Sequence, residues 1–161
     1  MTEPDGSGAA GGVPTFEPKG HVTPLRSADS SEVGVRICVP AFPVEVAGIR
    51  AAVVALAVAH GVPPALRDDI SLAVSEACAN VVMHAYADTA TPGPLSVDAY
   101  RESREFVVVV SDEGPGIAPR ADSPGLGLGL ALIARLVARL EIADRTPSGA
   151  RLTMAFAIPP A

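Results

Sequence analysis

The 161-residue sequence has little that would suit a zinc site or a nucleic-acid surface. Its two cysteines, Cys38 and Cys78, form no Cys-x-x-Cys pair, so two buried, reduced thiols are the simplest interpretation. Lysine and arginine form no cluster, and the formal charge is −6. A phosphate backbone would therefore be repelled, and we expect no direct nucleic-acid partner.

Long hydrophobic runs are also missing. The longest, residues 51–59, is far shorter than the roughly 20 residues that a membrane-spanning helix needs. No run of seven apolar residues occurs before Val35, so the start of the chain lacks the apolar region of a secretory signal. These absences predict a soluble, cytoplasmic protein without membrane contact.

The first 33 residues differ in composition from the rest of the chain, because 16 of them are Gly, Pro, Ser or Thr. Ordering such a segment would cost backbone entropy that little apolar burial could offset. We therefore predict a disordered tail over residues 1–33. The remaining residues, 34–161, are enough for one domain with a sizeable core.

Hydrophobic periodicity predicts alternating strands and helices within this domain. A period of two predicts a strand at 34–40, and spacings of three and four predict helices from Pro43 to Gly61 and over 65–86. Further strands are expected at 95–100, 105–111, 141–144 and 151–157, with a helix from Leu130 to about Leu140. This order predicts an α/β two-layer sandwich, in which a mixed, mainly antiparallel sheet carries helices on one face.

Polar side chains lie along one edge of the second predicted helix, in the stretch SEACANVVMHAY at residues 75–86. At about 100° per residue, Glu76 lies about 60° and Asn80 about 20° from Ala73 on the apolar face. A partly buried carboxylate beside an amide oxygen can supply a general base and a Mg²⁺ ligand. Taken alone, such a pair is more typical of a solvated helix face.

The segment DEGPGIA, residues 112–118, directly follows a valine-rich predicted strand. Asp112 can accept a hydrogen bond from an exocyclic amino group, and Gly114 and Gly116 would let the backbone approach a flat base. The same glycines could also form an ordinary turn. The motif by itself therefore leaves both interpretations open.

A second glycine motif, GLGLGL at residues 125–130, opens a predicted helix. The free N–H groups at a helix N-terminus suit phosphate oxygens. A Walker A loop is excluded because Gly-Lys-Ser/Thr is absent, and a dinucleotide-binding fingerprint because Leu130 stands where its last glycine would be. The motif alone is weak evidence for a nucleotide.

The three motifs SEACANVVMHAY, DEGPGI and GLGLGLALI, in this order, resemble the GHKL ATPase superfamily of gyrase, Hsp90, histidine kinases and MutL. Within it, they resemble the small anti-sigma-factor serine/threonine kinases. The resemblance spans about residues 34–158. It implies ATP and Mg²⁺ as cofactors, Glu76 as the catalytic base, Asn80 as the Mg²⁺ ligand and Asp112 as the adenine-binding residue. The other nucleotide-binding positions that it implies are Gly114, Gly116, Arg120, Gly125, Gly127 and Gly129, with a short ATP lid at 118–124.

This resemblance also implies a function and partners. The chain would transfer the γ-phosphoryl group of ATP to a Ser or Thr of a STAS-type anti-sigma factor antagonist, while that antagonist and a sigma factor compete for the kinase. A homodimer is implied as well. A sensor histidine kinase fits less well, because it needs a phosphoacceptor helix pair that the 33 preceding residues cannot supply.

Two departures from the family pattern keep an alternative open. No Lys or Arg occurs from Ala121 to Ala134, which leaves Arg120 as the nearest cation, and Gly149-Ala150 stands where relatives usually have Gly-Thr. A missing cation would affect phosphoryl transfer more than binding. The alternative function is a non-catalytic ATP-binding module that sequesters a protein partner.

Overall fold

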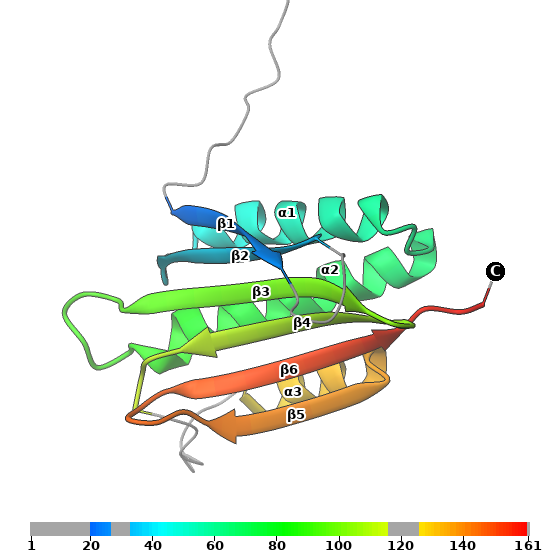
Figure 1. Cartoon of the computed structure of the whole chain (residues 1–161). Coiled ribbons are helices and arrows are strands. Elements are labelled where there is room, and N and C mark those ends of the chain that lie inside the picture. The colour runs from blue at the N-terminus through cyan, green and yellow to red at the C-terminus, as the bar shows by residue number, and fades with distance from the viewer. Residues whose placement is uncertain (1–19, 27–32, 116–125, 161) are drawn as a thin grey trace, which may run out of the picture.

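The computed structural model describes residues 20–26, 33–115 and 126–160 (Figure 1). Within these ranges the chain forms six strands, three α-helices and one π-helical turn, η1. Their bounds are β1 His21–Arg26, β2 Val33–Pro40, α1 Glu45–Ala59, α2 Pro64–Asn80, η1 Val81–Ala85, β3 Pro94–Glu102, β4 Glu105–Asp112, α3 Leu126–Leu136, β5 Arg139–Asp144 and β6 Ala150–Ala157. None of the helices in these ranges is long and apolar enough to cross a membrane.

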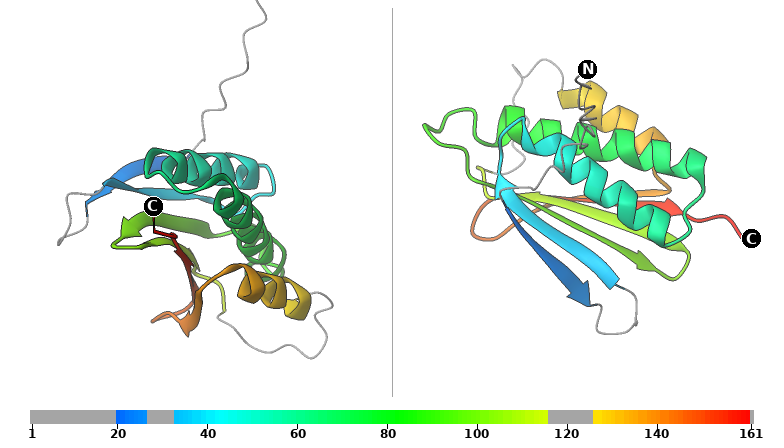
Figure 2. Two further views of the ribbon diagram at one scale, coloured as in Figure 1. Left: turned by 90° about the vertical axis from the view of Figure 1, so that its right-hand side faces the viewer. Right: turned by 90° about the horizontal axis from the view of Figure 1, so that it is seen from above.

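The strands form one sheet in the order β1-β2-β3-β4-β6-β5, and the three helices cover one of its faces (Figure 2). This arrangement confirms the predicted two-layer α/β fold. The expected mixture of parallel and antiparallel pairs is not observed, because every neighbouring pair among the described strands is antiparallel. After α3 the chain enters β5, which runs parallel to β4. The two strands are not neighbours, because β6 lies between them.

The prediction of a disordered tail over residues 1–33 is wrong for β1. This strand pairs with β2 from His21 opposite Cys38 to Arg26 opposite Val33. Composition averaged over 33 residues obscured the short segment HVTPLR, which satisfies its backbone by pairing with an available sheet edge. Pro24 is tolerated because β1 is an edge strand. The predicted tail residues 1–19 and 27–32 lie outside the described residues.

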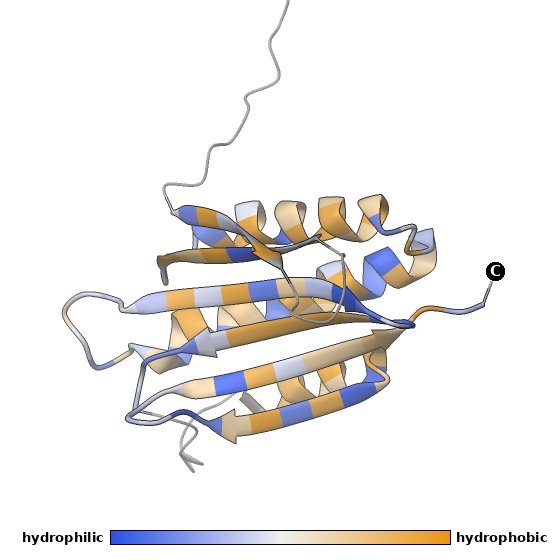
Figure 3. Cartoon of the chain, viewed as in Figure 1, coloured by the Kyte–Doolittle hydropathy of each residue, from blue (hydrophilic) through white to orange (hydrophobic). Residues whose placement is uncertain are grey.

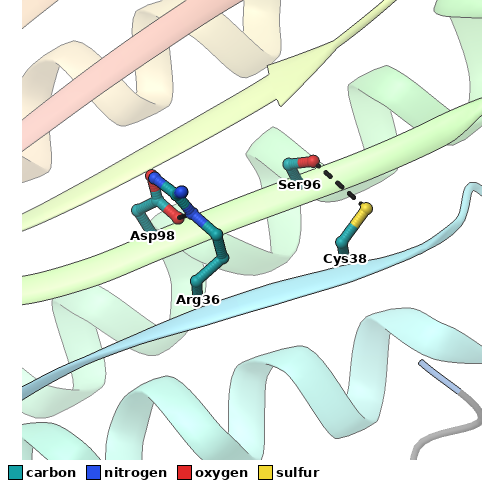
Figure 4. Close-up of polar contacts among 4 residues, drawn as sticks. All are labelled: Arg36, Cys38, Ser96 and Asp98. Carbon is teal, nitrogen blue, oxygen red and sulfur yellow. Dashed lines mark hydrogen bonds and ion pairs between the residues drawn. The ribbon is translucent and has the colours of Figure 1, made fainter. Parts of the chain in front are cut away.

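Alternating side chains separate the two faces of the sheet, and Figure 3 shows this alternation along β3 and β5. In β2, Ile37 and Val39 are buried in the core, whereas Arg36 and Cys38 are exposed. On that open face Arg36 donates two hydrogen bonds of 2.7 Å to Asp98, and the Ser96 hydroxyl donates to Cys38 Sγ at 3.5 Å (Figure 4).

The expectation of two buried thiols is therefore half wrong. Cys38 is exposed because its position in β2 is out of phase with the core-facing residues. Cys78 is buried in α2, and the loss of hydration raises the pKa of its thiol to about 12. Both cysteines are free in the structure.

The helices pack through the predicted apolar stripes. Five side chains are all buried against the inner face of the sheet: Ile49 and Val53 of α1, Ile70 and Ala73 of α2, and Ile133 of α3.

Two helix boundaries differ from expectation. The third helix begins at Leu126 and ends at Leu136, so it includes part of the glycine motif, and the following residues join β5 instead of extending the helix. The second helix changes to the wider η1 turn after Asn80.

Candidate nucleotide-binding site

The two polar residues singled out in α2 lie where this helix meets the first turn of α3. Glu76 and Asn80 are both half-buried, as their angular distance from the apolar face predicted. A Cβ atom at Gly129 would collide with Glu76 Oε1 and lie 3.3 Å from Asn80 Nδ2. The structure therefore brings two motifs that are far apart in the sequence into direct contact.

Gly129 is needed at this contact because the α3 backbone lies against the Glu76 carboxylate. Gly127, two residues earlier, differs, because a Cβ atom there would meet no atom of the described residues within 4 Å. The described residues leave space in front of Gly127, and the N–H groups of the first turn of α3 lack partners within the helix, so this surface suits an anion. We call Glu76, Asn80, Gly127 and Gly129 the phosphate end of the site.

Asn80 provides a test of whether this end fits a nucleotide. Its Nδ2 is buried and has no hydrogen-bond partner among residues 20–26, 33–115 and 126–160. A buried amide donor without an acceptor is costly in a folded protein, and a phosphate oxygen would satisfy it. The amide oxygen of the same side chain is a ligand type that Mg²⁺ accepts. The residues present therefore fit a magnesium-bound phosphate.

Asp112, the last residue of β4, lies at the other end of the site and is only 7% exposed. Its Oδ1 accepts hydrogen bonds from the N–H groups of Gly114 at 2.9 Å and Ala150 at 3.3 Å. Both bonds fall on the same oxygen, so among the described residues Oδ2 receives none. Loss of hydration raises the pKa of the Asp112 carboxyl, although these two N–H groups and the charge of Arg145 act in the opposite direction.

Two glycines allow the backbone to close around Asp112. Gly149 has a φ of 112°, and a Cβ atom there would collide with the Asp112 carbonyl oxygen. A Cβ atom at Gly114 would collide with the carbonyl oxygen of Ala85 in η1. The close approach made by Gly114 in this structure is therefore to the end of the helix. We call Asp112 and the groups that hold it the adenine end of the site.

Three further side chains hold the backbone of residues 112 and 113. The Tyr86 hydroxyl accepts a hydrogen bond from the Glu113 N–H at 2.8 Å, Arg145 Nη1 donates to the Asp112 carbonyl at 3.0 Å, and the Ser148 hydroxyl donates to the Glu113 carbonyl at 3.3 Å. No local sequence pattern indicated Arg145 or Ser148, because they reach this segment only through the turn between β5 and β6.

His84 is the third polar residue along this edge of SEACANVVMHAY. Its Nε2 is buried and has no hydrogen-bond partner among the described residues, and the bonds that hold the end of the helix come from Tyr86. Three other predicted positions, Gly116, Arg120 and Gly125, lie outside the described residues. The predicted lid at 118–124 lies outside them as well.

Comparison with known proteins identifies the class of domain that this fold and site belong to. Residues 39–156 match the family of histidine kinase-like ATPase domains, and the chain belongs to this family. Membership implies that the nucleotide is ATP and confirms the resemblance predicted from the three motifs.

Two curated relatives narrow the comparison. The chain is 36% identical over 102 residues to the serine-protein kinase RsbW of Halalkalibacterium halodurans, a match covering 54% of this chain and 60% of the relative. It is 28% identical over 98 residues to the anti-sigma F factor of Clostridium acetobutylicum, covering 54% of this chain and 67% of the relative. The chain thus spans about two thirds of the length of these relatives or less.

Two solved structures share the fold. The crystal structure of the RsbU and RsbW domains of a Mycobacterium tuberculosis protein has a TM-score of 0.61 and 23% identity, covering 80% of this chain and 33% of that one. The histidine kinase domain of a blue-light activated kinase from Erythrobacter litoralis has a TM-score of 0.53 and 24% identity, covering 74% of this chain and 62% of that one. At this level of identity, the likeness concerns the fold.

Proposed function

We propose that this chain is an ATP-dependent serine/threonine protein kinase that acts as an anti-sigma factor. It would phosphorylate an anti-sigma factor antagonist and thereby regulate transcription in the cytoplasm by exchanging partners. The observation that carries the proposal is the meeting of Glu76 and Asn80 with Gly129 at the first turn of α3. The names of the curated relatives, a serine-protein kinase and an anti-sigma F factor, support it.

The adenine end of the site would select and orient the nucleotide. The Oδ2 of Asp112 can accept a hydrogen bond from the exocyclic amino group of adenine, because the hydrogen bonds that hold the carboxylate fall on Oδ1. A base that lacks this amino group would leave this acceptor unpaired, which is costly. Asp112 would thus favour adenine over other bases.

The phosphate end would carry out the transfer. Glu76, held beside the first turn of α3, would accept the proton of the substrate hydroxyl as its oxygen attacks the γ-phosphorus and ADP leaves. The N–H groups of that first turn would stabilise the charge on the phosphate oxygens. Mg²⁺, for which Asn80 would supply the amide oxygen, would neutralise charge on the β- and γ-phosphates.

A second candidate is the non-catalytic module that binds ATP and sequesters a partner. The observation that favours it is the position of the basic residue in α3, because Arg135 lies in the last turn, away from the phosphate end. The described part of α3 therefore brings no cation to the transferred phosphate. Both candidates share ATP binding and differ in whether the γ-phosphoryl group moves to a protein.

Two successive measurements test the proposal. Calorimetric titration with Mg·ATP should show a saturable site on the protein alone, and no binding would contradict both candidates. Incubation with γ-labelled ATP and candidate antagonists should then label a Ser or Thr of the antagonist. Binding of ATP and of the sigma factor without any labelling across these antagonists would favour the second candidate. The homodimer implied by the family resemblance stays a prediction that sedimentation can test.

A further inference from the structure

One hydroxyl group connects the two ends of the proposed nucleotide site. Tyr86 directly follows η1, which continues α2, the helix that carries Glu76 and Asn80. Its hydroxyl oxygen accepts the Glu113 N–H at 2.8 Å, next to Asp112. The same hydroxyl donates to the carbonyl oxygen of Pro94, the first residue of β3, at 2.7 Å.

The geometry around this tyrosine leaves its ring little freedom. A Cβ atom at Gly93 would collide with the ring and lie 2.9 Å from its hydroxyl oxygen, so the ring lies directly on the Gly93 backbone. Burial raises the pKa of the Tyr86 hydroxyl, which keeps it protonated and able to donate. A fixed ring whose hydroxyl accepts one hydrogen bond and donates another rigidly connects the end of η1 to the start of β3 and to the residue that follows β4.

The Glu113 backbone is held from a second direction, since the Ser148 hydroxyl donates to its carbonyl oxygen at 3.3 Å. Tyr86 therefore fixes Glu113 relative to α2, and Ser148 fixes it relative to the β5–β6 turn. Because Asp112 and Glu113 are consecutive, a shift of one moves the other. The distance between the adenine end and the phosphate end then depends on the Tyr86 bond.

We propose that Tyr86 is a positioning residue for base selection, whose hydroxyl holds Asp112 at the distance from Glu76 and Asn80 that one ATP molecule spans. The residue acts through the Asp112–Glu113 backbone and not through the reacting atoms. This inference rests on the proposed ATP binding. Its consequence is that loss of the hydroxyl should reduce the preference for adenine and leave the phosphate end intact.

The test uses the full chain and the variant Tyr86→Phe, which keeps the ring. Affinities for Mg·ATP and for Mg·inosine triphosphate, which lacks the adenine amino group, are measured by calorimetry. We expect the preference for ATP over inosine triphosphate to fall by about tenfold, equivalent to one lost hydrogen bond. Ser148→Ala, on the other side of Glu113, should change the preference in the same direction by a smaller factor.

The matched control is Tyr100→Phe, because Tyr100 is the other tyrosine of the chain and is likewise half-buried. It lies in β3 and pairs with Val107, so the preference should be unchanged. Glu113 is exposed, and water can replace the lost acceptor, so we expect Tyr86→Phe to fold.

The outcomes separate the inference from the proposed function. Wild-type protein that binds neither nucleotide would overturn the proposed function itself. Wild-type binding with an unchanged preference in Tyr86→Phe would overturn the inference alone. Equal loss of affinity for both nucleotides, together with a lower melting temperature, would also overturn it, because that pattern describes a merely structural role.

Discussion

The two ends of the candidate site are held in different ways. At the adenine end, Asp112 has two N–H donors on one carboxylate oxygen, and its carbonyl oxygen has a third donor in Arg145. At the phosphate end, the described residues offer no hydrogen-bond partner to the buried Asn80 Nδ2 and leave the space before Gly127 open. The adenine end is therefore organised before the nucleotide arrives, whereas the phosphate end contains a polar group that a ligand would satisfy.

This difference has an energetic reason. A carboxylate with one oxygen saturated by backbone donors keeps its orientation, so little ordering cost remains when a base binds. The unpaired amide of Asn80 costs free energy in the free protein, and under the proposed function a phosphate oxygen that accepts its hydrogen bond would recover that cost. We infer that base recognition contributes mainly selectivity and that the phosphates contribute much of the affinity.

The largest effect is expected at Glu76. Glu76→Gln keeps the size of the side chain but removes the proton acceptor, so kinase turnover should fall by about 10²- to 10⁴-fold, the usual contribution of a general base. Mg·ATP affinity should change little. Turnover is measured as labelled phosphate in the antagonist, and turnover equal to wild type would rule out Glu76 as the base.

The same position separates the two candidate functions. Under the kinase proposal, Glu76→Ala should abolish phosphorylation and thereby keep the antagonist active. Under the sequestration alternative, Glu76→Ala should leave partner regulation as in wild type. A transcription assay with the sigma factor and antagonist present distinguishes these results.

The next effect concerns the contact between α2 and α3. The methyl group of Gly129→Ala would displace the end of the Glu76 side chain, which can rotate away without disturbing the backbone. We expect turnover to fall by about 10²-fold, because small misplacements of a catalytic group have effects of this size. The melting temperature should stay the same or rise, since alanine favours a helix over glycine by up to about 1 kcal/mol.

Gly127→Ala is the stability control for this variant, because its methyl group would meet no atom within the part of the chain that the structure describes. Gly127→Ala should raise the helix propensity of α3 by the same amount as Gly129→Ala. If Gly129→Ala instead lowers the melting temperature strongly relative to Gly127→Ala, the contact with Glu76 is rigid and the explanation by side-chain rotation is wrong.

A third effect, of about 10- to 100-fold in ATP affinity, is expected for Asp112→Asn. The amide oxygen can still accept the Gly114 and Ala150 N–H groups, but the NH₂ group would face the adenine amino group donor to donor. Calorimetry with Mg·ATP measures the loss. Unchanged affinity would show that Asp112 does not contact the base.

The same variant tests the pKa of Asp112 through stability. Burial raises the folded-state pKa of this carboxyl, so its neutral form is the one favoured by folding. The resulting stabilisation is complete below the unfolded pKa and is lost as pH rises through the folded pKa. Denaturant unfolding of the free proteins should therefore show Asp112→Asn gaining stability relative to wild type as pH rises through this window. A gain that grows as pH falls would contradict the raised pKa.

The smallest effect is expected at Ala150. Its N–H already donates to Asp112 Oδ1, and Ala150→Thr would retain this bond and add the hydroxyl that the Gly-Thr pattern of the resemblance implies. One added hydrogen bond contributes about 1 kcal/mol, so ATP affinity should increase by less than tenfold. A decrease measured by calorimetry would mean that the threonine side chain does not fit beside the adenine end.

Much of the candidate site could be predicted from local sequence. The apolar spacing in α2 placed Glu76 and Asn80 at the border of the core, and both are half-buried. Asp112 was expected at a strand end and is the last residue of β4. Such features depend on residues within one element, where the periods of helices and strands decide which way a side chain points.

Features that depend on pairing between distant segments were missed. β1 was assigned to a disordered tail, and Cys38 was expected to be buried although it lies on the open face of the sheet. Arg145 and Ser148 carried no local signal for their bonds to residues 112 and 113. Their positions follow from the antiparallel pairing of β6 with both β4 and β5.

The sequence by itself determined the family, the two-layer fold and three ordered motifs, because hydrophobic periods and turn residues act over short distances. Only the tertiary structure decided how the motifs meet. The contact of Gly129 with Glu76, the close approach of Gly149 to Asp112, and the bridge from Tyr86 to Glu113 all join residues from different elements. Such contacts follow from the packing of the helices onto the sheet and from the pairing of its strands, which no local pattern records.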